Sequence, residues 1–225
     1  MGRKLFLLFF AFLPSSWKVF WLRSQGHKVG EGVHIGICYL DVRRLDLGNR
    51  VKIGNFNYFK NVRLLEMADG ARIGGKFNWI TASRFNDMDD EGFGILRMRR
   101  SAGITGTHFF DLAGSITVGE ETLIAGFRST FMTHAMSADG DNKNAPISFG
   151  RRCYVGGQVI FLPGASLGDC SFAGSGAVVT KSFSELSHVL VAGNPAQVRK
   201  TYPPDAKWFT TEHDYAPKPR TKKPQ

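Results

Sequence analysis

His134 stands where a histidine could do chemistry. It is one of six histidines, and it ends an apolar run and opens a polar segment in the phrase Phe131-Met132-Thr133-His134-Ala135. A hydroxyl is a poor nucleophile until it loses its proton. An imidazole with a pKa of about 6.5 can accept that proton at neutral pH. His134 is therefore the candidate general base, and a histidine hydrogen-bonded at a turn is the alternative.

The elements that position these residues follow from a repeat of six residues. A large apolar residue, usually followed by Gly or Ala, recurs at this spacing at Phe149, Val155, Phe161, Leu167 and Ala173, and upstream at Leu112, Val118, Ile124, Val29, Ile35, Leu47, Ile53 and, after a slip of phase, Ile73. A small or medium residue stands four positions after each of the five starts from Phe149, and Ile116, Thr122 and Arg128 hold the same place after Leu112, Val118 and Ile124. Six is not a helical period, so short strands joined by tight turns are predicted.

This pattern resembles that of the hexapeptide-repeat acyltransferases, whose fold is a left-handed parallel β-helix. The resemblance implies an all-β solenoid with protruding loops, a short apolar helical N-terminal segment and a basic C-terminal tail. It divides the chain into an N-terminal segment (1–28), a β-helix acyltransferase domain (29–200) and a tail (201–225). Asp41 falls at an expected apolar position, so the first coils should be imperfect. Polar stretches at 84–94 and 135–146 should protrude as loops.

The same resemblance implies a coenzyme-A-dependent O-acyltransferase, for which the apolar, basic N-terminus suggests a role in polysaccharide biosynthesis. It would move an acetyl or similar small acyl group from acetyl-CoA to a hydroxyl of a carbohydrate or glycoconjugate, with His134 as base. His108 and Asp111 would line the acceptor pocket, although a partly buried structural role is open for His108. The resemblance also implies a homotrimer, with the donor and the acceptor meeting between neighbouring chains, and no metal.

Donor recognition is predicted in the C-terminal third, where residues 154–164, 173–181 and 192–196 resemble the family's signature coils. By analogy, the residues that contact the pantetheine arm are Gly156, Gly157, Ala173, Gly174 and Ser175. Those that face the nucleotide phosphates are Thr180, Lys181, Arg199 and Lys200, because basic side chains suit phosphate oxygens. The alternative is that the glycines serve only as corner residues.

The N-terminal segment permits two interpretations. Its apolar run, residues 5–13, follows Arg3 and Lys4 and is shorter than the roughly 20 residues that a spanning helix needs. Apolar character resumes beyond Pro14, where a cleavage site would be expected, so the segment should be retained. Residues 1–23 either contact the inner face of a membrane from the cytoplasm or cap the open end of the core.

Charge and cysteine content exclude other classes. The formal net charge is +10, part of it carried by the polar run 217–225, and no zinc-finger, RNP-like or basic-zipper pattern accompanies it. A nucleic-acid partner is therefore not expected. The three cysteines are odd in number and widely spaced, which favours buried thiols in a reducing compartment.

Two rival functions remain for such a fold. A metal-dependent hydratase would need several histidines that converge on one ion, and the isolation of His108 and His134 argues against it. A non-catalytic scaffold is disfavoured by the setting of His134 and by the Asn194-Pro195 ending.

Overall fold

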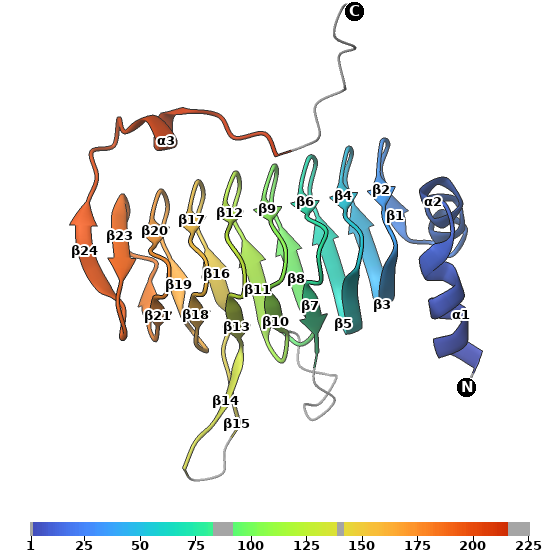
Figure 1. Ribbon diagram of the computed structural model, residues 1–225, viewed down its shortest axis with the longest axis horizontal. Helices are drawn as coiled ribbons and strands as arrows, with labels where there is room; N and C mark the ends of the chain where they lie inside the picture. The colour runs from blue at the N-terminus through green and yellow to red at the C-terminus, as the bar shows by residue number, and fades with distance from the viewer. Residues whose placement is uncertain (1, 83–91, 139–141, 216–225) are drawn as a thin grey trace, which may run out of the picture.

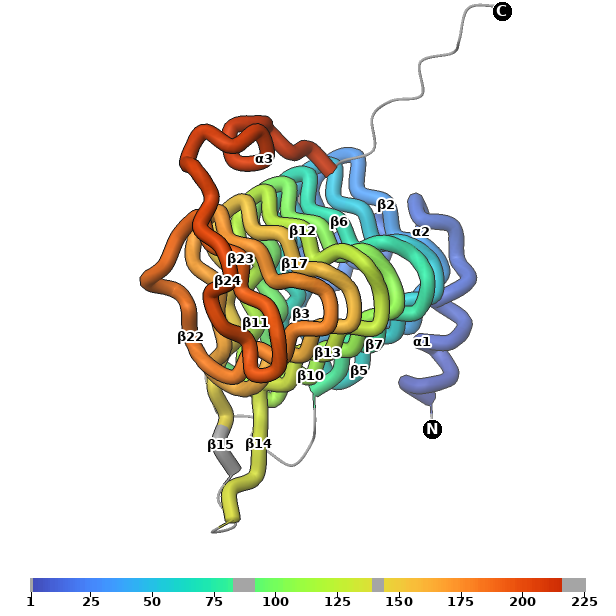
Figure 2. Tube along the Cα trace, turned by 60° about the vertical axis from the view of Figure 1, so that its left-hand side comes forward, coloured from blue at the N-terminus to red at the C-terminus, as the bar shows by residue number. Residues whose placement is uncertain are grey.

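A computed structural model describes residues 2–82, 92–138 and 142–215 of the chain. The chain winds into a stack of coils, each made of short strands that meet at corners around one apolar core (Figures 1 and 2). The loop predicted at 84–94 falls mostly on residues outside the described part. The second predicted loop is a hairpin of β14 (His134–Met136) and β15 (Asn142–Asn144) that projects from the stack (Figure 1).

Parallel pairing between successive coils builds three faces. Face 1 consists of the first halves of β3 (Cys38–Leu47) and β5 (Asn57–Met67), then β7 (Trp79–Thr81), β10 (Phe109–Asp111), β13 (Thr130–Met132), β18 (Ile160–Phe161) and β21 (Val178–Val179). Face 2 consists of β1 (Lys28–Val29), the second halves of β3 and β5, then β8 (Ile95–Met98), β11 (Ser115–Val118), β16 (Ile147–Phe149), β19 (Ser166–Leu167) and β22 (Ser182–Phe183). Face 3 consists of β2 (His34–Ile35), β4 (Lys52–Ile53), β6 (Arg72–Ile73), β9 (Gly103–Ile104), β12 (Leu123–Ile124), β17 (Tyr154–Val155), β20 (Phe172–Ala173), β23 (Val189–Ala192) and the antiparallel β24 (Gln197–Thr201).

The six-residue repeat places its apolar positions in the core, as predicted. The five repeat starts from Phe149 to Ala173 are each at most 3% exposed. They also stack on one another, since Val155 pairs with Ala173 on face 3 and Phe149 pairs with Leu167 on face 2. The solenoid expected from the sequence is therefore confirmed.

Two departures from the repeat have local causes. Arg128 is not equivalent to the buried residues at the same place in other coils: it is exposed at a corner with φ 56°, and the buried residue is Ser129. The turn after Ile124 contains one extra residue, which moves every following position by one. Asp41, by contrast, marks an irregular coil as expected, because the pairing of β3 with β5 shifts register between Leu40 and Val42.

Two helices close the N-terminal end of the stack. The helices α1 (Gly2–Phe12) and α2 (Ser15–Ser24) lie across the first coils, and Phe10 and Leu22 are each 2% exposed against the core (Figure 1). The buried Lys18 ammonium donates to the carbonyl oxygens of Ala11 at 2.8 Å and Gly36 at 2.5 Å. Burial lowers the pKa of Lys18. The capping interpretation is thus correct for the inner side of this segment.

The C-terminal segment folds back along face 3 (Figure 1). It contains α3 (Lys207–Thr210), and Trp208 packs edge-on against Tyr154 and Phe172. The indole Nε1 of Trp208 donates to the Arg152 carbonyl at 3.1 Å, and the backbone N–H of His213 donates to Glu121 at 3.2 Å. Residues 203–215 therefore cover much of one flank.

The buried carboxylate of Glu121 holds this segment in place. Burial opposes its ionisation, but its hydrogen bonds to Arg152 and to the backbone of His213, together with the charges of Arg152 and Arg100, outweigh burial and lower its pKa. Nε of Arg152 donates to the Glu121 carboxylate at 2.8 Å, and the Arg100 guanidinium donates to the same carboxylate at 3.2 Å.

Face 1 is the apolar flank that nothing in the described chain covers. Its outward side chains form a ladder, with Tyr39 stacked on Tyr58 at 5.0 Å and Tyr58 next to Trp79 at 5.1 Å. Trp79 pairs in register with Phe109, and the two are 52% and 40% exposed. Face 2 instead carries ion pairs such as that of Glu66 with Arg97.

Candidate active site

His134 lies at the corner between faces 1 and 2, as the first residue of the projecting hairpin. It follows β13 at the point where the chain leaves the stack, and its side chain is 46% exposed. The preceding residue, Thr133, is fully buried. The backbone next to His134 is therefore fixed in the stack, while the imidazole ring is partly open to solvent.

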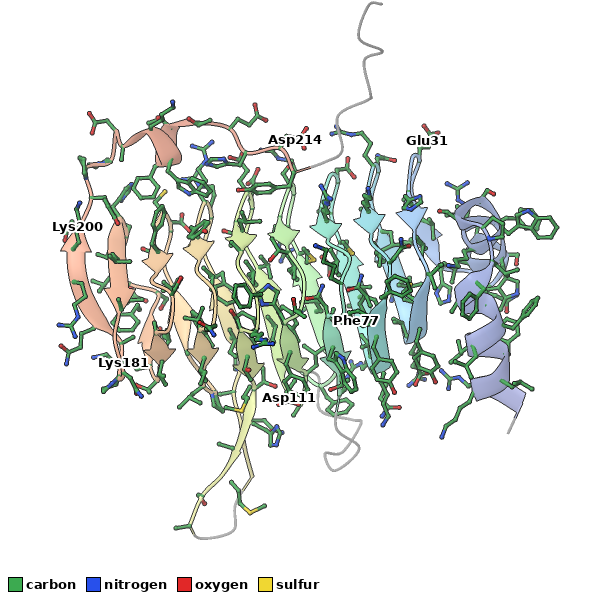
Figure 3. All side chains as sticks on the ribbon, viewed as in Figure 1. Glu31, Phe77, Asp111, Lys181, Lys200 and Asp214 are labelled. Carbon is green, nitrogen blue, oxygen red and sulfur yellow. The ribbon has the colours of Figure 1, made fainter. Side chains whose placement is uncertain are left out.

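Asp111 orients this imidazole. It ends β10 in the adjacent coil (Figure 3). There it pairs in register with Met132. One carboxylate oxygen, Oδ2, lies 2.5 Å from Nδ1 of His134. An ionised carboxylate only accepts hydrogen bonds, so Nδ1 carries the proton and the other ring nitrogen, Nε2, is left as an acceptor. This is the arrangement that a general base requires.

The Asp111 carboxylate is itself fixed by buried backbone donors. Oδ2 also accepts from the Thr133 N–H and Oδ1 from the Ala113 N–H, each at 3.3 Å. The Thr133 hydroxyl donates to the Asp111 carbonyl at 2.8 Å and accepts from the Gly114 N–H at 2.7 Å. Two neighbouring coils are thereby joined beside His134, which limits the freedom of both side chains.

The pairing of Asp111 with His134 was not anticipated, because the sequence interpretation placed Asp111 in the acceptor pocket. The acceptor role stays a prediction. The signal that would have found the pair is the register of face 1, since Phe110 and Phe131 stack in successive coils and align the residues that follow them.

His108 is buried, with 1% of its surface exposed, and belongs to an internal polar ladder. At the corner between faces 3 and 1, successive coils place Asn57, Asn78, His108 and Ser129 above one another. His108 Nδ1 accepts from the Ser129 N–H at 3.2 Å, and Nε2 lies 3.0 Å from the Thr105 hydroxyl. Because that hydroxyl donates to the Gly126 carbonyl, Nε2 donates to it. These bonds support the structural interpretation of His108, and its place in the acceptor pocket stays a prediction.

Burial lowers the pKa of His108 to about 4. We expect His108→Leu, which leaves the buried Ser129 N–H without an acceptor, to destabilise the fold by about 1–3 kcal/mol in urea denaturation. His108→Asn should cost less, because Asn78 already fills the equivalent place one coil earlier.

A pH series separates the contribution of the His108 hydrogen bond from that of its lowered pKa. The unfolded chain binds a proton near pH 6.5 and the folded chain only near 4, so stability from this residue is complete above pH 6.5 and is lost as the pH falls toward 4. Over that interval the unmodified protein should lose more stability than His108→Asn. Parallel losses in the two proteins would contradict the low pKa.

The predicted donor residues do not lie beside His134. Gly156 and Gly157 form the corner between faces 3 and 1, where the Gly157 N–H donates to the Ser175 hydroxyl at 3.2 Å. A Cβ on Gly156 would approach that hydroxyl to 2.7 Å, so a close contact between coils requires glycine here. Gly174 belongs to the same corner, and the Ala173 side chain is buried in the core.

The residues predicted to face phosphates are exposed at the C-terminal end of the stack. They are Thr180, Lys181, Arg199 and Lys200. Figure 3 shows Lys181 and Lys200 well apart on the final coils. Arg199 Nε donates to the Ala192 carbonyl at 3.3 Å, and the Lys200 ammonium lies 4.9 Å from the Tyr202 ring centroid. The structure does not bring these cations into one cluster, and their role stays a prediction.

A shallow depression of about 400 Å³ lies at the corner between faces 3 and 1 and on the adjoining edge of face 1. Phe77, Trp79, Phe109 and Arg128 contribute to its lining. Within the described ranges, no three His, Cys, Asp or Glu side chains are grouped as metal ligands would be.

The stacked coils and their six-residue repeat belong to the hexapeptide-repeat β-helix class of folds. No protein-family model matches the chain. Galactoside O-acetyltransferase of Escherichia coli (strain K12) is 32% identical over 89 residues, which are 37% of this chain and 43% of that protein. The chain thus matches less than half the length of this relative.

A solved structure confirms the fold over most of the chain. It is a variant of AntD, an N-acyltransferase from Bacillus cereus, in complex with dTDP-4-amino-4,6-dideoxyglucose and coenzyme A. Its TM-score is 0.54 at 14% identity, over 82% of this chain and 88% of that one. The fold is the left-handed parallel β-helix, and the predicted resemblance to hexapeptide-repeat acyltransferases is confirmed.

Proposed function

We propose that this chain is a coenzyme-A-dependent O-acyltransferase that moves an acetyl or similar small acyl group onto a hydroxyl of a carbohydrate. The hydrogen bond between Asp111 and His134 carries this proposal, because it prepares Nε2 as a base at an exposed corner. The sequence similarity to a galactoside O-acetyltransferase supports the donor and acceptor classes.

The proposed reaction proceeds by addition and elimination. Nε2 of His134 takes the hydroxyl proton as the acceptor oxygen attacks the thioester carbonyl, and the negative charge of Asp111 stabilises the imidazolium. The tetrahedral intermediate then collapses, its carbon–sulfur bond breaks, and Nε2 returns the proton to the departing thiolate. The products are the ester and free coenzyme A, so the base is regenerated without a metal or an oxidant.

The site is proposed to form between copies of the chain in a homotrimer. In one chain His134 and the glycines of the predicted donor coils stand at opposite edges of face 1, so one copy alone does not bring them together. Face 1 also exposes Phe56, Phe77 and Phe127 at one corner, each more than half exposed. Contiguous exposed apolar surface of this kind marks an interface.

The proposed cellular location of the enzyme follows from its acyl donor. Acyl-coenzyme A is a cytoplasmic thioester, so we place the enzyme in the cytoplasm, at the inner face of the membrane. Among the described residues no helix combines the length and the apolar character needed to cross a bilayer.

The test is transfer by the purified full-length protein. We expect a trimer by light scattering that releases free thiol from acetyl-CoA only when a hydroxyl-bearing saccharide is present, with the ester detected by mass spectrometry. A panel of galactosides and nucleotide-linked sugars serves as acceptors, and a matched deoxy sugar is the control. A stable monomer without coenzyme A binding in calorimetry would overturn the proposal and revive the scaffold alternative.

A further inference from the structure

The N-terminal helices have a second apolar side that faces away from the core. On α1, Leu7, Phe10 and Ala11 are buried, whereas Leu5, Leu8, Phe9 and Phe12 are 69%, 53%, 67% and 73% exposed. On α2, Trp17 and Phe20 are 68% and 76% exposed. We call these six exposed residues the outer stripe. A helix that is apolar on all sides is normally buried on all sides, so the outer stripe requires a partner.

Charge favours a lipid surface as that partner. The first thirty residues contain Arg3, Lys4, Lys18, Arg23 and Lys28 and no Asp or Glu. Two copies placed stripe to stripe would bring the exposed cations together, whereas an anionic bilayer would be complementary to them. Lys18 is buried, and Arg3 and Lys28 pair with Asp41 and Asp46 on the first coil. Lys4 and Arg23 are then the exposed cations of this segment that no carboxylate in the described part of the chain pairs.

The form of the cap also suits a bilayer surface. The two helices lie across one end of the stack and are 11 and 10 residues long, too short to span. Aromatic rings next to basic side chains are typical of segments that lie in the headgroup region. Trp17, Phe9 and Phe20 supply the rings.

We propose that the outer stripe inserts into the boundary between headgroups and acyl chains of an anionic membrane, so that the β-helix stands on the bilayer. This deepens the proposed location at the inner face of the membrane. Four coil steps of about 4.8 Å separate β3 from β13, which places His134 about 20 Å above the first coil. The cap would bind lipid whether or not His134 supports transfer.

The experiment is co-sedimentation of the full-length protein with vesicles. Vesicles of phosphatidylcholine with one third phosphatidylglycerol should bind the protein, and binding should weaken in pure phosphatidylcholine and at high salt. Phe9→Ser/Phe20→Ser should bind at least tenfold more weakly, because each ring loses its insertion into the acyl region. The matched control is Leu186→Ser/Val198→Ser, which removes two exposed apolar side chains, 41% and 42% exposed, at the other end of the stack.

Equal binding by the Phe9/Phe20 variant and the unmodified protein would overturn the proposal, as would no binding to anionic vesicles. A smaller particle for that variant in light scattering, without vesicle binding by either protein, would assign the stripe to contacts between copies instead. Thermal melts and transfer to a soluble acceptor check that the variant is folded. If the unmodified protein binds vesicles but shows no acyl transfer, that result would count against the proposed function and not against membrane binding.

Discussion

Replacement of His134 by alanine lowers kcat for acyl transfer by about two to four orders of magnitude, the range that a positioned general base contributes. The imidazole is half exposed and its neighbour Thr133 supplies the contacts within the stack, so the fold should be unaffected. The KM for acetyl-CoA should change little, because the base acts on the acceptor hydroxyl. Initial rates from thiol release, with saturating acceptor, measure the effect.

His34→Ala is the control for this substitution. His34 is exposed on face 3, far along the stack from β13, and its removal should leave turnover unchanged. Turnover close to that of the unmodified protein in His134→Ala would reject the assignment of the base. A lower melting temperature of the His134→Ala variant would instead indicate that His134 has a structural role.

Asp111→Asn should lower kcat by about two to three orders of magnitude. The amide has nearly the same volume and can still accept from Nδ1–H, but it lacks the charge that stabilises the imidazolium and can favour the wrong tautomer. The buried backbone donors at Thr133 and Ala113 keep an oxygen acceptor, so unfolding by urea should change modestly.

The double variant distinguishes positioning from bulk electrostatics. If Asp111 acts through His134, then Asp111→Asn adds little to the loss already caused by His134→Ala. Asp46→Asn, which removes the carboxylate paired with Lys28 on face 2, is the matched control and should retain full activity. Additive losses in the double variant would show that Asp111 acts independently of the imidazole.

The period of six was sufficient to predict the solenoid, because a backbone that turns at fixed spacing must bury the same position in every coil. Interactions between coils were not readable in the same way. Asp111 and His134 meet because the chain completes one coil between them, and the extra residue before Ser129 alters that count. A constant period therefore predicts the core better than it predicts which polar side chains become neighbours.

The two ends of the chain show the same limit. Both interpretations of the N-terminal segment rested on its apolar content, which does not tell which side of a helix faces the core. In the structure Phe10 faces the core, whereas Phe9 is exposed. The C-terminal segment has no period, so the packing of Trp208 on Tyr154 could not be predicted from the sequence.

The C-terminal segment changes how the stack should unfold. In a solenoid each coil contacts only its neighbours, so stability is close to a sum of nearest-neighbour terms and the ends fray first. Here the last part of the chain returns to earlier coils: Arg152 donates to the Phe209 carbonyl at 2.5 Å, and Asp214 lies 3.8 Å from Arg50 near the start of the stack. Loosening the final coils therefore also strips contacts from the middle of the molecule. Because these contacts couple coils that are not adjacent, the stack should unfold more cooperatively than a solenoid with nearest-neighbour contacts alone.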